Sequence, residues 1–287
     1  MLPVEQKSTC ISTSDNAARL ARYIEQHRSL FVLTGAGCST ASGIPDYRDD
    51  KGEWKHSKPV QFQDFIQHRL TRQRYWARSL LGWPRVFAAQ PGLAHHALRK
   101  LEQAGAIHYL ITQNVDRLHQ RAGSLRVIDL HGNLERVSCL SCFFQLTRVE
   151  MQEKLRKENP AFNEKSHELA PDGDAVLDNY DFSGFHIIDC SHCGGILKPD
   201  VVFFGESVPK KRVQMAMQYL QESKALLVVG SSLMVYSGYR FCRAASKSGL
   251  PLSALNRGRT RADAELQLKI EDDCGETLQA TIELLGL

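Results

Sequence analysis

Short apolar runs that lack a two-residue alternation constrain this 287-residue chain more than any other feature. Residues 30–33 and 225–229 are apolar on both faces, and helical stretches separate such runs along the chain. A strand that is apolar on both faces must be covered on both faces. Alternation of helices with buried strands is typical of a parallel sheet between two helical layers. The sequence therefore predicts an α/β fold with a doubly wound, Rossmann-like parallel sheet.

Two regions interrupt this alternation and predict a smaller lobe. Residues 54–83 are rich in aromatic and arginine residues and favour a small helical insert. Residues 136–199 hold four cysteines and a polar stretch, 159–189, with a turn signal at Pro171-Asp172-Gly173. We expect one domain, 1–287, whose large lobe comes from 12–50, 84–135 and 200–287. The small lobe would combine a helical segment, 51–83, with a metal-binding module, 136–199.

Four of the eight cysteines form two close pairs, Cys139 with Cys142 and Cys190 with Cys193. A spacing of two residues lets both thiolates of a pair reach one ion, and two pairs complete a tetrahedral zinc site that is closed to water. The glycines directly after Cys193 suit such a turn. The 47 residues between the pairs exceed a usual zinc ribbon, which indicates a sub-domain inside the site. A redox dithiol, the alternative, would need only one pair.

Gly35-Ala36-Gly37 follows the first apolar run, at the sheet edge where ligands bind in such folds. Glycines at a strand-to-helix turn let backbone N–H groups approach a phosphate, and a helix start favours its charge. A full dinucleotide fingerprint would have a third glycine or alanine where this chain has Thr40. The motif alone therefore fits a phosphate loop or a plain tight turn. Tyr47 and Arg48 end the next loop, where they could cover a ring and pair with a phosphate.

Polar residues also follow other predicted strands. Gln113, Asn114 and Asp116 come directly after residues 106–111, and they offer donors and acceptors for a carboxamide and ribose hydroxyls. A helix N-cap would explain Asn114 and Asp116 as well, but it would not explain Gln113. Residues 230–232 and 256–258 end two further runs. Because the carboxyl ends of parallel strands meet at one edge of a sheet, we expect these turns to converge.

His131 stands apart from the other ten histidines because it follows residues 127–130, again at a strand end. A neutral imidazole there would suit a general base near neutral pH. The other histidines are expected to be structural or exposed. Cys38 is expected to be a small packing residue beside the glycine turn.

The composition argues against several classes of protein. The net charge is +4 without a long basic block, so no nucleic-acid partner is expected, and Lys210-Lys211-Arg212 is interpreted as a solvated helix start. No apolar run reaches the length of a membrane span. Residues 1–11 lack both the apolar core of a secretory signal and the arginine-rich pattern of a transit peptide.

Taken in order, these motifs resemble those of the sirtuin family, over residues 30–275. The Asp49-Asp50-Lys51-Gly52 run after Arg48 and the long loop between the cysteine pairs look most like the mitochondrial class II branch, the sirtuin four branch. The matching segments are 35–39, 43–48, 112–116, 131–132, both cysteine pairs, 198–206, 230–233 and Asn256.

The resemblance implies an enzyme that removes acyl groups from protein lysines, with NAD as co-substrate and one structural Zn²⁺. The acyl oxygen would attack the ribose as nicotinamide leaves, and His131 would then draw a proton through the ribose hydroxyls, giving lysine and O-acyl-ADP-ribose. The catalytic positions would be His131 and Asn114. The NAD-binding positions would be Gly35, Ala36, Gly37, Ser39, Pro45, Asp46, Tyr47, Arg48, Gln113, Asn114, Val115, Asp116, Gly230, Ser231, Ser232, Asn256, Arg257, Gly258 and Cys274. The zinc ligands would be Cys139, Cys142, Cys190 and Cys193, and the peptide would lie by strand addition against Val202, Phe203, Phe204, Gly205, Leu233 and Val235.

Three residues bear on the substrate. Tyr75 and Arg78 resemble the Tyr-x-x-Arg pair with which the desuccinylating branch grips an acyl carboxylate, and a helix would place them on one face. An ordinary exposed helix face is the alternative. We therefore expect larger or acidic acyl groups, such as lipoyl, biotinyl or hydroxymethylglutaryl. Ser237 stands where the family commonly has proline, so the peptide-clamping geometry is expected to differ.

Other functions stay open. One is mono-ADP-ribosyl transfer to a protein, and another is a non-catalytic module that senses NAD. A hydride-transferring dehydrogenase is disfavoured because the third glycine is missing and no acidic ribose residue stands at the usual offset. By resemblance, the protein is expected in the mitochondrial matrix, as a monomer that acts on metabolic enzymes. The 159–189 insertion is expected to reach the mouth of the active site.

Overall fold

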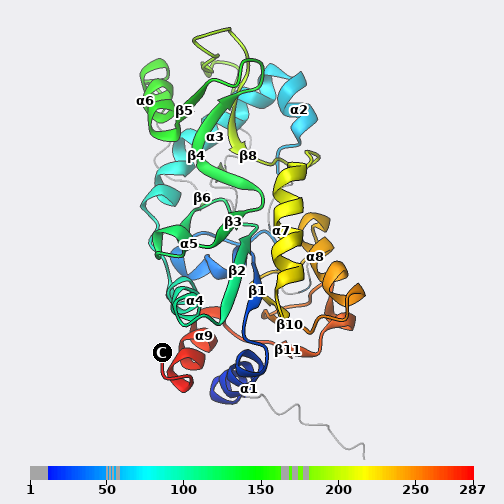
Figure 1. Ribbon diagram of the computed structural model, residues 1–287. Helices are drawn as coiled ribbons and strands as arrows, with labels where there is room; N and C mark the ends of the chain where they lie inside the picture. The colour runs from blue at the N-terminus through cyan, green and yellow to red at the C-terminus, as the bar shows by residue number, and fades with distance from the viewer. Residues whose placement is uncertain are drawn as a thin grey trace, which may run out of the picture.

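The computed structural model describes residues 12–49, 51, 53, 55, 59–162, 168–169, 174–176 and 181–287. The predicted turn at Pro171-Asp172-Gly173 lies outside the described residues, as do Asp50, Gly52 and residues 1–11. The described chain forms two lobes, with the sheet of buried strands in the lower one and the cysteine pairs in the upper one (Figure 1). No helix in the described part of the chain is long and apolar enough to cross a membrane.

The large lobe contains a six-stranded sheet in which every neighbouring pair is parallel. Its strand order is β11-β10-β9-β1-β2-β3. The chain winds outward from β1 in one direction and then from β9 in the other, so the order reverses between β1 and β9. A reversal of this kind opens a crevice at the carboxyl ends of the two strands. The strands are β1 Leu30–Thr34, β2 Ile107–Thr112, β3 Val127–Asp129, β9 Ala225–Val229, β10 Leu252–Leu255 and β11 Leu268–Ile270.

Helices cover both faces of this sheet, as the apolar strands require. On one face α1 (Thr13–Gln26), α4 (Leu93–Gln103) and α9 (Cys274–Leu284) pack their apolar sides on the strands. On the other face α7 (Lys210–Glu222) and α8 (Tyr236–Lys247) do the same. All five residues of β1 and of β9 are buried. The predicted doubly wound sheet is thus confirmed.

Local details differ from the sequence interpretation at three places. The sequence predicts a helix that Asp15 opens. Helix α1 instead begins at Thr13, because the Ser12 hydroxyl accepts the Asp15 N–H and caps the helix. The glycine turn leads into two short 3₁₀ helices, Ala36–Cys38 and Thr40–Ser42, so no α-helix begins directly after β1. The helix start expected behind a phosphate is therefore a single 3₁₀ turn. Strand β11 was not predicted, because three residues are too few to show a pattern.

The small lobe is built from helices α2 (Phe62–Gln67), α3 (Arg69–Ala88) and α6 (Arg148–Glu158) around an antiparallel sheet. That sheet has the order β5-β4-β8, from Gln145–Thr147, Gly132–Cys139 and Leu197–Val201. Two further short strands, β6 (Glu168–Leu169) and β7 (Ala175–Val176), pair with each other. One apolar cluster joins α2, α3, α6 and the sheet, and it includes two of the cysteines. A further short helix, α5 (Leu118–Arg121), lies near the junction of the lobes.

Candidate active site

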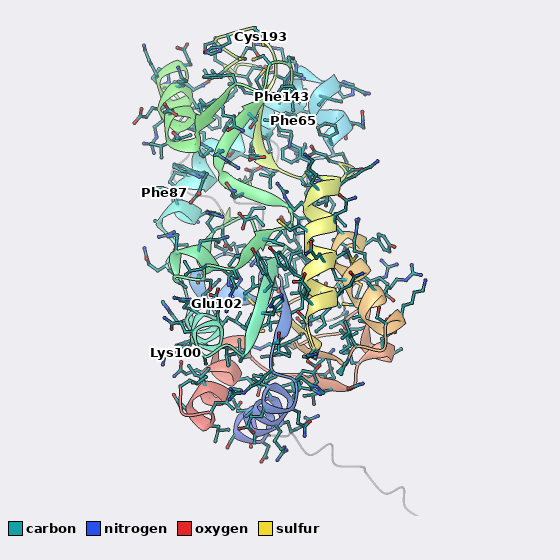
Figure 2. The ribbon with its side chains drawn as sticks, in the orientation of Figure 1. Phe65, Phe87, Lys100, Glu102, Phe143 and Cys193 are labelled. Carbon is teal, nitrogen blue, oxygen red and sulfur yellow. The ribbon has the colours of Figure 1, made fainter. Side chains whose placement is uncertain are left out.

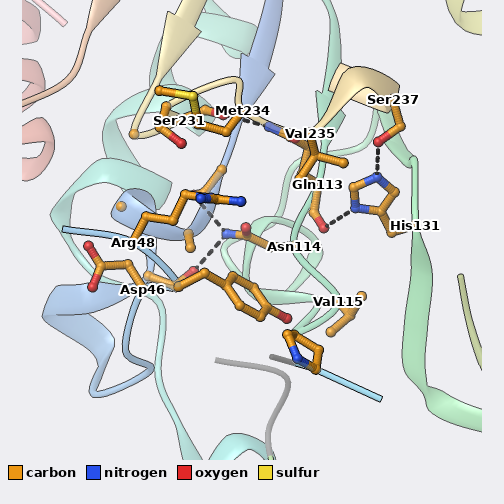
Figure 3. A pocket seen from close by; sticks show the side chains of 18 of the residues that line it. Asp46, Arg48, Gln113, Asn114, Val115, His131, Ser231, Met234, Val235 and Ser237 are labelled. Atoms are coloured by element: carbon orange, nitrogen blue, oxygen red, sulfur yellow. Dashed lines mark hydrogen bonds between the residues drawn. The ribbon is translucent and has the colours of Figure 1, made fainter. Parts of the chain in front are cut away.

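A cavity of about 1030 Å³ lies at the carboxyl edge of the parallel sheet and extends to the small lobe. The loops after β1, β2 and β9 contribute to its wall, together with the segment after β8 and the start of α8. Figure 3 shows side chains from these segments directed toward one another. The predicted convergence of turns at strand ends is therefore present in the structure.

The loops after β1 and β9 are locked together by glycines. The Gly37 N–H donates to the Gly230 carbonyl at 2.9 Å. A Cβ on Gly35 would lie 2.7 Å from the Ser231 Cβ, and a Cβ on Gly37 would lie 2.9 Å from the Gly230 Cα. Gly230 has φ +62°, and a Cβ there would lie 2.6 Å from the Cys38 backbone nitrogen. These glycines are thus required by contact between the two loops.

Gln113 and Asn114 tie the end of β2 to both loops (Figure 3). The Gln113 side-chain amide donates to the Ser231 hydroxyl at 2.7 Å. The Asn114 side-chain amide donates to the Gly35 carbonyl at 3.0 Å and to the Ser39 hydroxyl at 3.0 Å. Three strand ends are therefore held in one hydrogen-bonded unit, which fixes the cavity wall before any ligand arrives.

Asp116 lies two residues before Leu118, the first residue of α5, whose N-cap is Arg117. One carboxylate oxygen of Asp116 accepts the Leu118 N–H at 2.9 Å. The other accepts the Ser39 hydroxyl at 2.7 Å, and the residue lines the cavity. Burial raises the pKa of Asp116, and the bonds from Leu118 and Ser39 oppose that rise.

His131 lies at the β3–β4 junction and faces the cavity (Figure 3). Its Nδ1 is 2.9 Å from the Gln113 carbonyl oxygen, and its Nε2 is 2.8 Å from the Ser237 hydroxyl. Burial lowers the pKa of His131 to about 4, and the charges of Arg212 and Arg240 lower it further, against the effect of the Gln113 bond. The imidazole is therefore neutral near pH 7, the state that a general base needs.

The backbone around His131 is fixed by close approach to the end of β8 and to the residue that follows it. Gly132 has φ +79°, and a Cβ there would overlap the Asp200 carbonyl oxygen. The Val202 N–H donates to the His131 carbonyl at 2.7 Å. Leu233, on the facing loop, is 1% exposed and has φ +58°, an uncommon conformation for a side chain other than glycine. The segments predicted to hold a peptide thus border the histidine.

The structure separates the two members of the predicted acyl-gripping pair. Tyr75 lines the cavity, and its ring packs on Phe65 and Phe203. Arg78 is 5% exposed and does not line the cavity; its Nε donates to the Ala175 carbonyl of β7 at 2.7 Å. Insertion strand β7 therefore covers Arg78, and no described residue of 159–189 reaches the cavity wall. The grip of this pair on a carboxylate stays a prediction.

Every predicted NAD or peptide position lines the cavity, including the distal turn Asn256-Arg257-Gly258 and Cys274 at the start of α9. Cys38 is buried and its thiol donates to the Val229 carbonyl at 3.4 Å, which fits a packing residue. The sequence interpretation missed other wall residues, because they sit inside helices or strands without a motif. These include Val86, Leu134, Lys210 and Arg240.

The four paired cysteines meet at one point of the small lobe, where Figure 2 labels Cys193. Cys139 and Cys193 have their sulfurs 3.6 Å apart, and so have Cys142 and Cys190. All four sulfurs lie within 4.8 Å of one another. Tetrahedral zinc with Zn–S bonds of about 2.3 Å would separate its sulfurs by about 3.8 Å. The cluster therefore fits one structural zinc, and Gly194, with φ +69°, provides the turn.

The comparisons with known proteins agree with this geometry. The Sir2 family model matches residues 35–237. An NAD-dependent protein deacetylase of Xanthomonas campestris is 55% identical over 93% of this chain and 92% of its own length. The NAD-dependent protein lipoamidase sirtuin-4, mitochondrial, of Bos taurus is 47% identical over 92% of this chain and 85% of its own length.

Solved structures lead to the same family. A Sir2 structure with a p53 peptide and NAD⁺ has a TM-score of 0.76 and 32% identity, over 93% of this chain and 98% of that one. A Sir2 structure bound to an acetylated peptide has a TM-score of 0.73 and 32% identity, over 94% of this chain and 98% of that one.

Sirtuins use NAD, and the interlocked loops, polar strand ends and large cavity described above suit that dinucleotide. Because similar relatives include both bacterial proteins and a mitochondrial one, the mitochondrial location stays a prediction. The family model and these relatives together show that the chain belongs to the Sir2, or sirtuin, family.

Proposed function

We propose that this protein is an NAD-dependent protein-lysine deacylase that releases nicotinamide and transfers the acyl group to ADP-ribose. One observation carries the proposal: the neutral imidazole of His131 faces the same cavity as the loops locked together at the β1/β9 reversal. Relatives named NAD-dependent protein deacetylase support the reaction class.

The residues divide the work between binding and proton transfer. NAD supplies the nicotinamide leaving group and the ribose that receives the acyl group. Asn114 and Asp116 would hold nicotinamide and its ribose; both line the cavity and belong to the hydrogen-bonded unit at the β1 and β2 ends. His131 would take a proton from a ribose hydroxyl at Nε2, since Nδ1 already bonds to a carbonyl. Tyr47 and Arg48 line the opening and would help to exclude water.

We infer that the preferred acyl group is larger than acetyl and uncharged, with lipoyl as the leading candidate. Five apolar side chains form one continuous section of the cavity wall, which favours an apolar acyl chain. The Arg78 guanidinium is hydrogen-bonded to the Ala175 carbonyl and does not line the cavity. The bovine relative named as a lipoamidase supports this choice. An acidic group would need Arg78 to leave its buried position. The apolar section consists of Ile44, Val86, Val115, Leu134 and Val201.

Nicotinamide release from NAD, measured with one peptide that carries acetyl-, lipoyl- or hydroxymethylglutaryl-lysine, tests both parts. Release that requires an acylated peptide and yields free lysine supports the deacylase. ADP-ribose attached to protein would favour ADP-ribosyl transfer, and NAD binding without release would favour a sensor. A hydroxymethylglutaryl peptide that outperforms the lipoyl peptide would contradict the uncharged preference.

A bulkier side chain in the apolar section sharpens the test. Val86→Phe should lower kcat/KM for the lipoyl peptide more than for the acetyl peptide, because the longer group needs more of the wall. The acetyl reaction serves as the internal control for folding. Equal losses for both peptides would place the acyl group elsewhere in the cavity.

A further inference from the structure

The serine at position 237 holds the proposed base from the side opposite its backbone anchor. Figure 3 shows the His131 imidazole between two oxygens, the Gln113 carbonyl at Nδ1 and the Ser237 hydroxyl at Nε2. The distances are 2.9 Å and 2.8 Å. The two partners come from different elements, the end of β2 and the start of α8.

These partners determine the tautomer of the ring. A carbonyl oxygen can only accept, so the Nδ1 atom of His131 carries the hydrogen that points to Gln113. A neutral imidazole has one N–H, and Nε2 therefore presents a lone pair. The Ser237 hydroxyl donates to that lone pair. The nitrogen that would receive a proton from substrate is thus kept as an acceptor.

The position of Ser237 is itself well determined. It is the second residue of α8, which follows Val235 as N-cap. One residue on, Gly238 packs against Gln113, where a Cβ would lie 2.6 Å from the side-chain oxygen. Phe241, one turn further along α8, is buried in the core beneath. The start of α8 cannot move outward without breaking these contacts, so the position of the Ser237 hydroxyl is fixed.

We propose that Ser237 is a positioning residue that turns the His131 ring so that its Nε2 lone pair faces the substrate hydroxyl. This inference rests on the proposed deacylase function. With only the Gln113 bond, the ring could tilt about that contact; the second bond fixes its plane. Ser237 sets this plane before the substrate binds, and a ribose hydroxyl then takes its place on the same lone pair without a further turn of the ring. The proton passes from the ribose oxygen to Nε2, and Ser237 keeps its own proton throughout.

The proposal predicts a separation of two reaction steps. Loss of nicotinamide precedes the need for a base, so exchange of labelled nicotinamide into NAD, in the presence of acyl peptide, should not depend on Ser237. Deacylation follows the proton transfer and should depend on it. Ser237→Ala should lower kcat for deacylation about three- to tenfold, as expected for one hydrogen bond, and leave the exchange rate unchanged. Ser237→Thr should restore deacylation, because it keeps the hydroxyl.

Ser246→Ala is the matched control, since Ser246 lies on the same helix and is exposed. Unchanged deacylation in Ser237→Ala would overturn the proposal, and so would an equal fall in exchange and deacylation, which would indicate a structural defect. Failure of Ser237→Thr to recover activity would also count against it. A wild-type protein with neither exchange nor deacylation would instead reject the proposed function.

Discussion

The two lobes of this protein are stabilised in different ways. In the large lobe, β1 and β9 are buried throughout, and helices pack on both faces of a six-stranded sheet. In the small lobe, three antiparallel strands and three helices share one apolar cluster, and four thiols converge at its end. We therefore expect apolar burial to suffice for the large lobe and the small lobe to rely on a metal as well.

This difference assigns different tasks to the lobes. The large lobe holds polar side chains at strand ends in one hydrogen-bonded unit, and its rigidity sets the geometry of the chemistry. The small lobe contributes apolar wall residues such as Tyr75, and insertion strand β7 packs against its helix α3 at Arg78. We expect changes in the large lobe to alter catalysis or overall stability and changes in the small lobe to alter substrate fit.

The largest effect should follow removal of zinc. Structural zinc in small domains binds with about 10–16 kcal/mol, which is as large as the whole net stability of a typical domain. Chelation, or Cys190→Ser, should abolish hydrogen-exchange protection in β4 and α6 and keep protection in β1. Readdition of zinc should restore the chelated protein but not the variant. A metal-free protein with β4 still protected would show that apolar burial suffices in both lobes.

Loss of the base should be the next largest effect, and it should leave both lobes folded. His131→Ala should slow deacylation by about 10²–10⁴-fold, the usual contribution of general base catalysis. Thermal unfolding should change little. His108→Ala is the matched control, because His108 is 3.2 Å from Glu222 in an exposed pair away from the cavity. A variant at position 131 that retained full deacylation would remove His131 from the mechanism.

The contact between the β1 and β9 loops can be broken by one methyl group. Gly230→Ala should destabilise the protein by about 2–4 kcal/mol and raise KM for NAD, because φ +62° and the Cys38 backbone both oppose a Cβ. Gly184→Ala is the control in the small lobe, where nothing lies within 4 Å of the added atom. Urea unfolding and NAD titration measure the two effects. Equal stability of the two variants would contradict the interlocked loops.

Acidification should weaken the large lobe through buried histidines. Burial lowers the pKa of His95 to about 4, with a further contribution from His96, and burial also lowers the pKa of His119. A histidine with a lowered folded pKa stabilises the fold fully above its unfolded value of about 6.5, and that stability is lost as pH falls toward 4. His95 should account for about 1 kcal/mol between pH 7 and pH 5.5.

Hydrogen exchange of β1 amides measures this loss within the large lobe, apart from any release of zinc. His95→Gln should reduce the pH dependence of β1 protection without abolishing it, since glutamine does not titrate while His119 and His131 still do. Equal protection at pH 7 and pH 5.5 in the wild type would contradict this prediction, because it would mean that acidification does not lower the free energy of unfolding through these histidines.

Much of the fold was predictable because it depends on local pattern. Residues 225–229 were expected as a buried strand and form β9, and the four paired cysteines were expected to converge and do. Helix α1 shows where local pattern was insufficient: Ser12, not Asp15, is the cap, and only the backbone path distinguishes them. Strand β11 exists because β10 offers an edge to pair with, which is a tertiary condition.

The candidate site divides along the same line. Residues in turns at strand ends were identifiable from the sequence, since a glycine, asparagine or histidine directly after an apolar strand is a visible signal. The apolar wall was not identifiable, because Val86 and Leu134 resemble any core residue until the lobes are placed together. Arg78 was expected beside Tyr75 from helical spacing, but neighbours beyond the helix decided where each side chain went.

The sequence by itself determined the parallel sheet, the thiol cluster and the family, because periodicity and spacing are properties of the chain alone. Tertiary structure decided which groups act on one another. The bond from Ser237 to His131 joins residues 106 positions apart, and the Gly230 contact joins the loops of two strands nearly 200 residues apart. Such contacts depend on the relative placement of whole elements, which arises only when the strands of the sheet and the loops at their ends pack together.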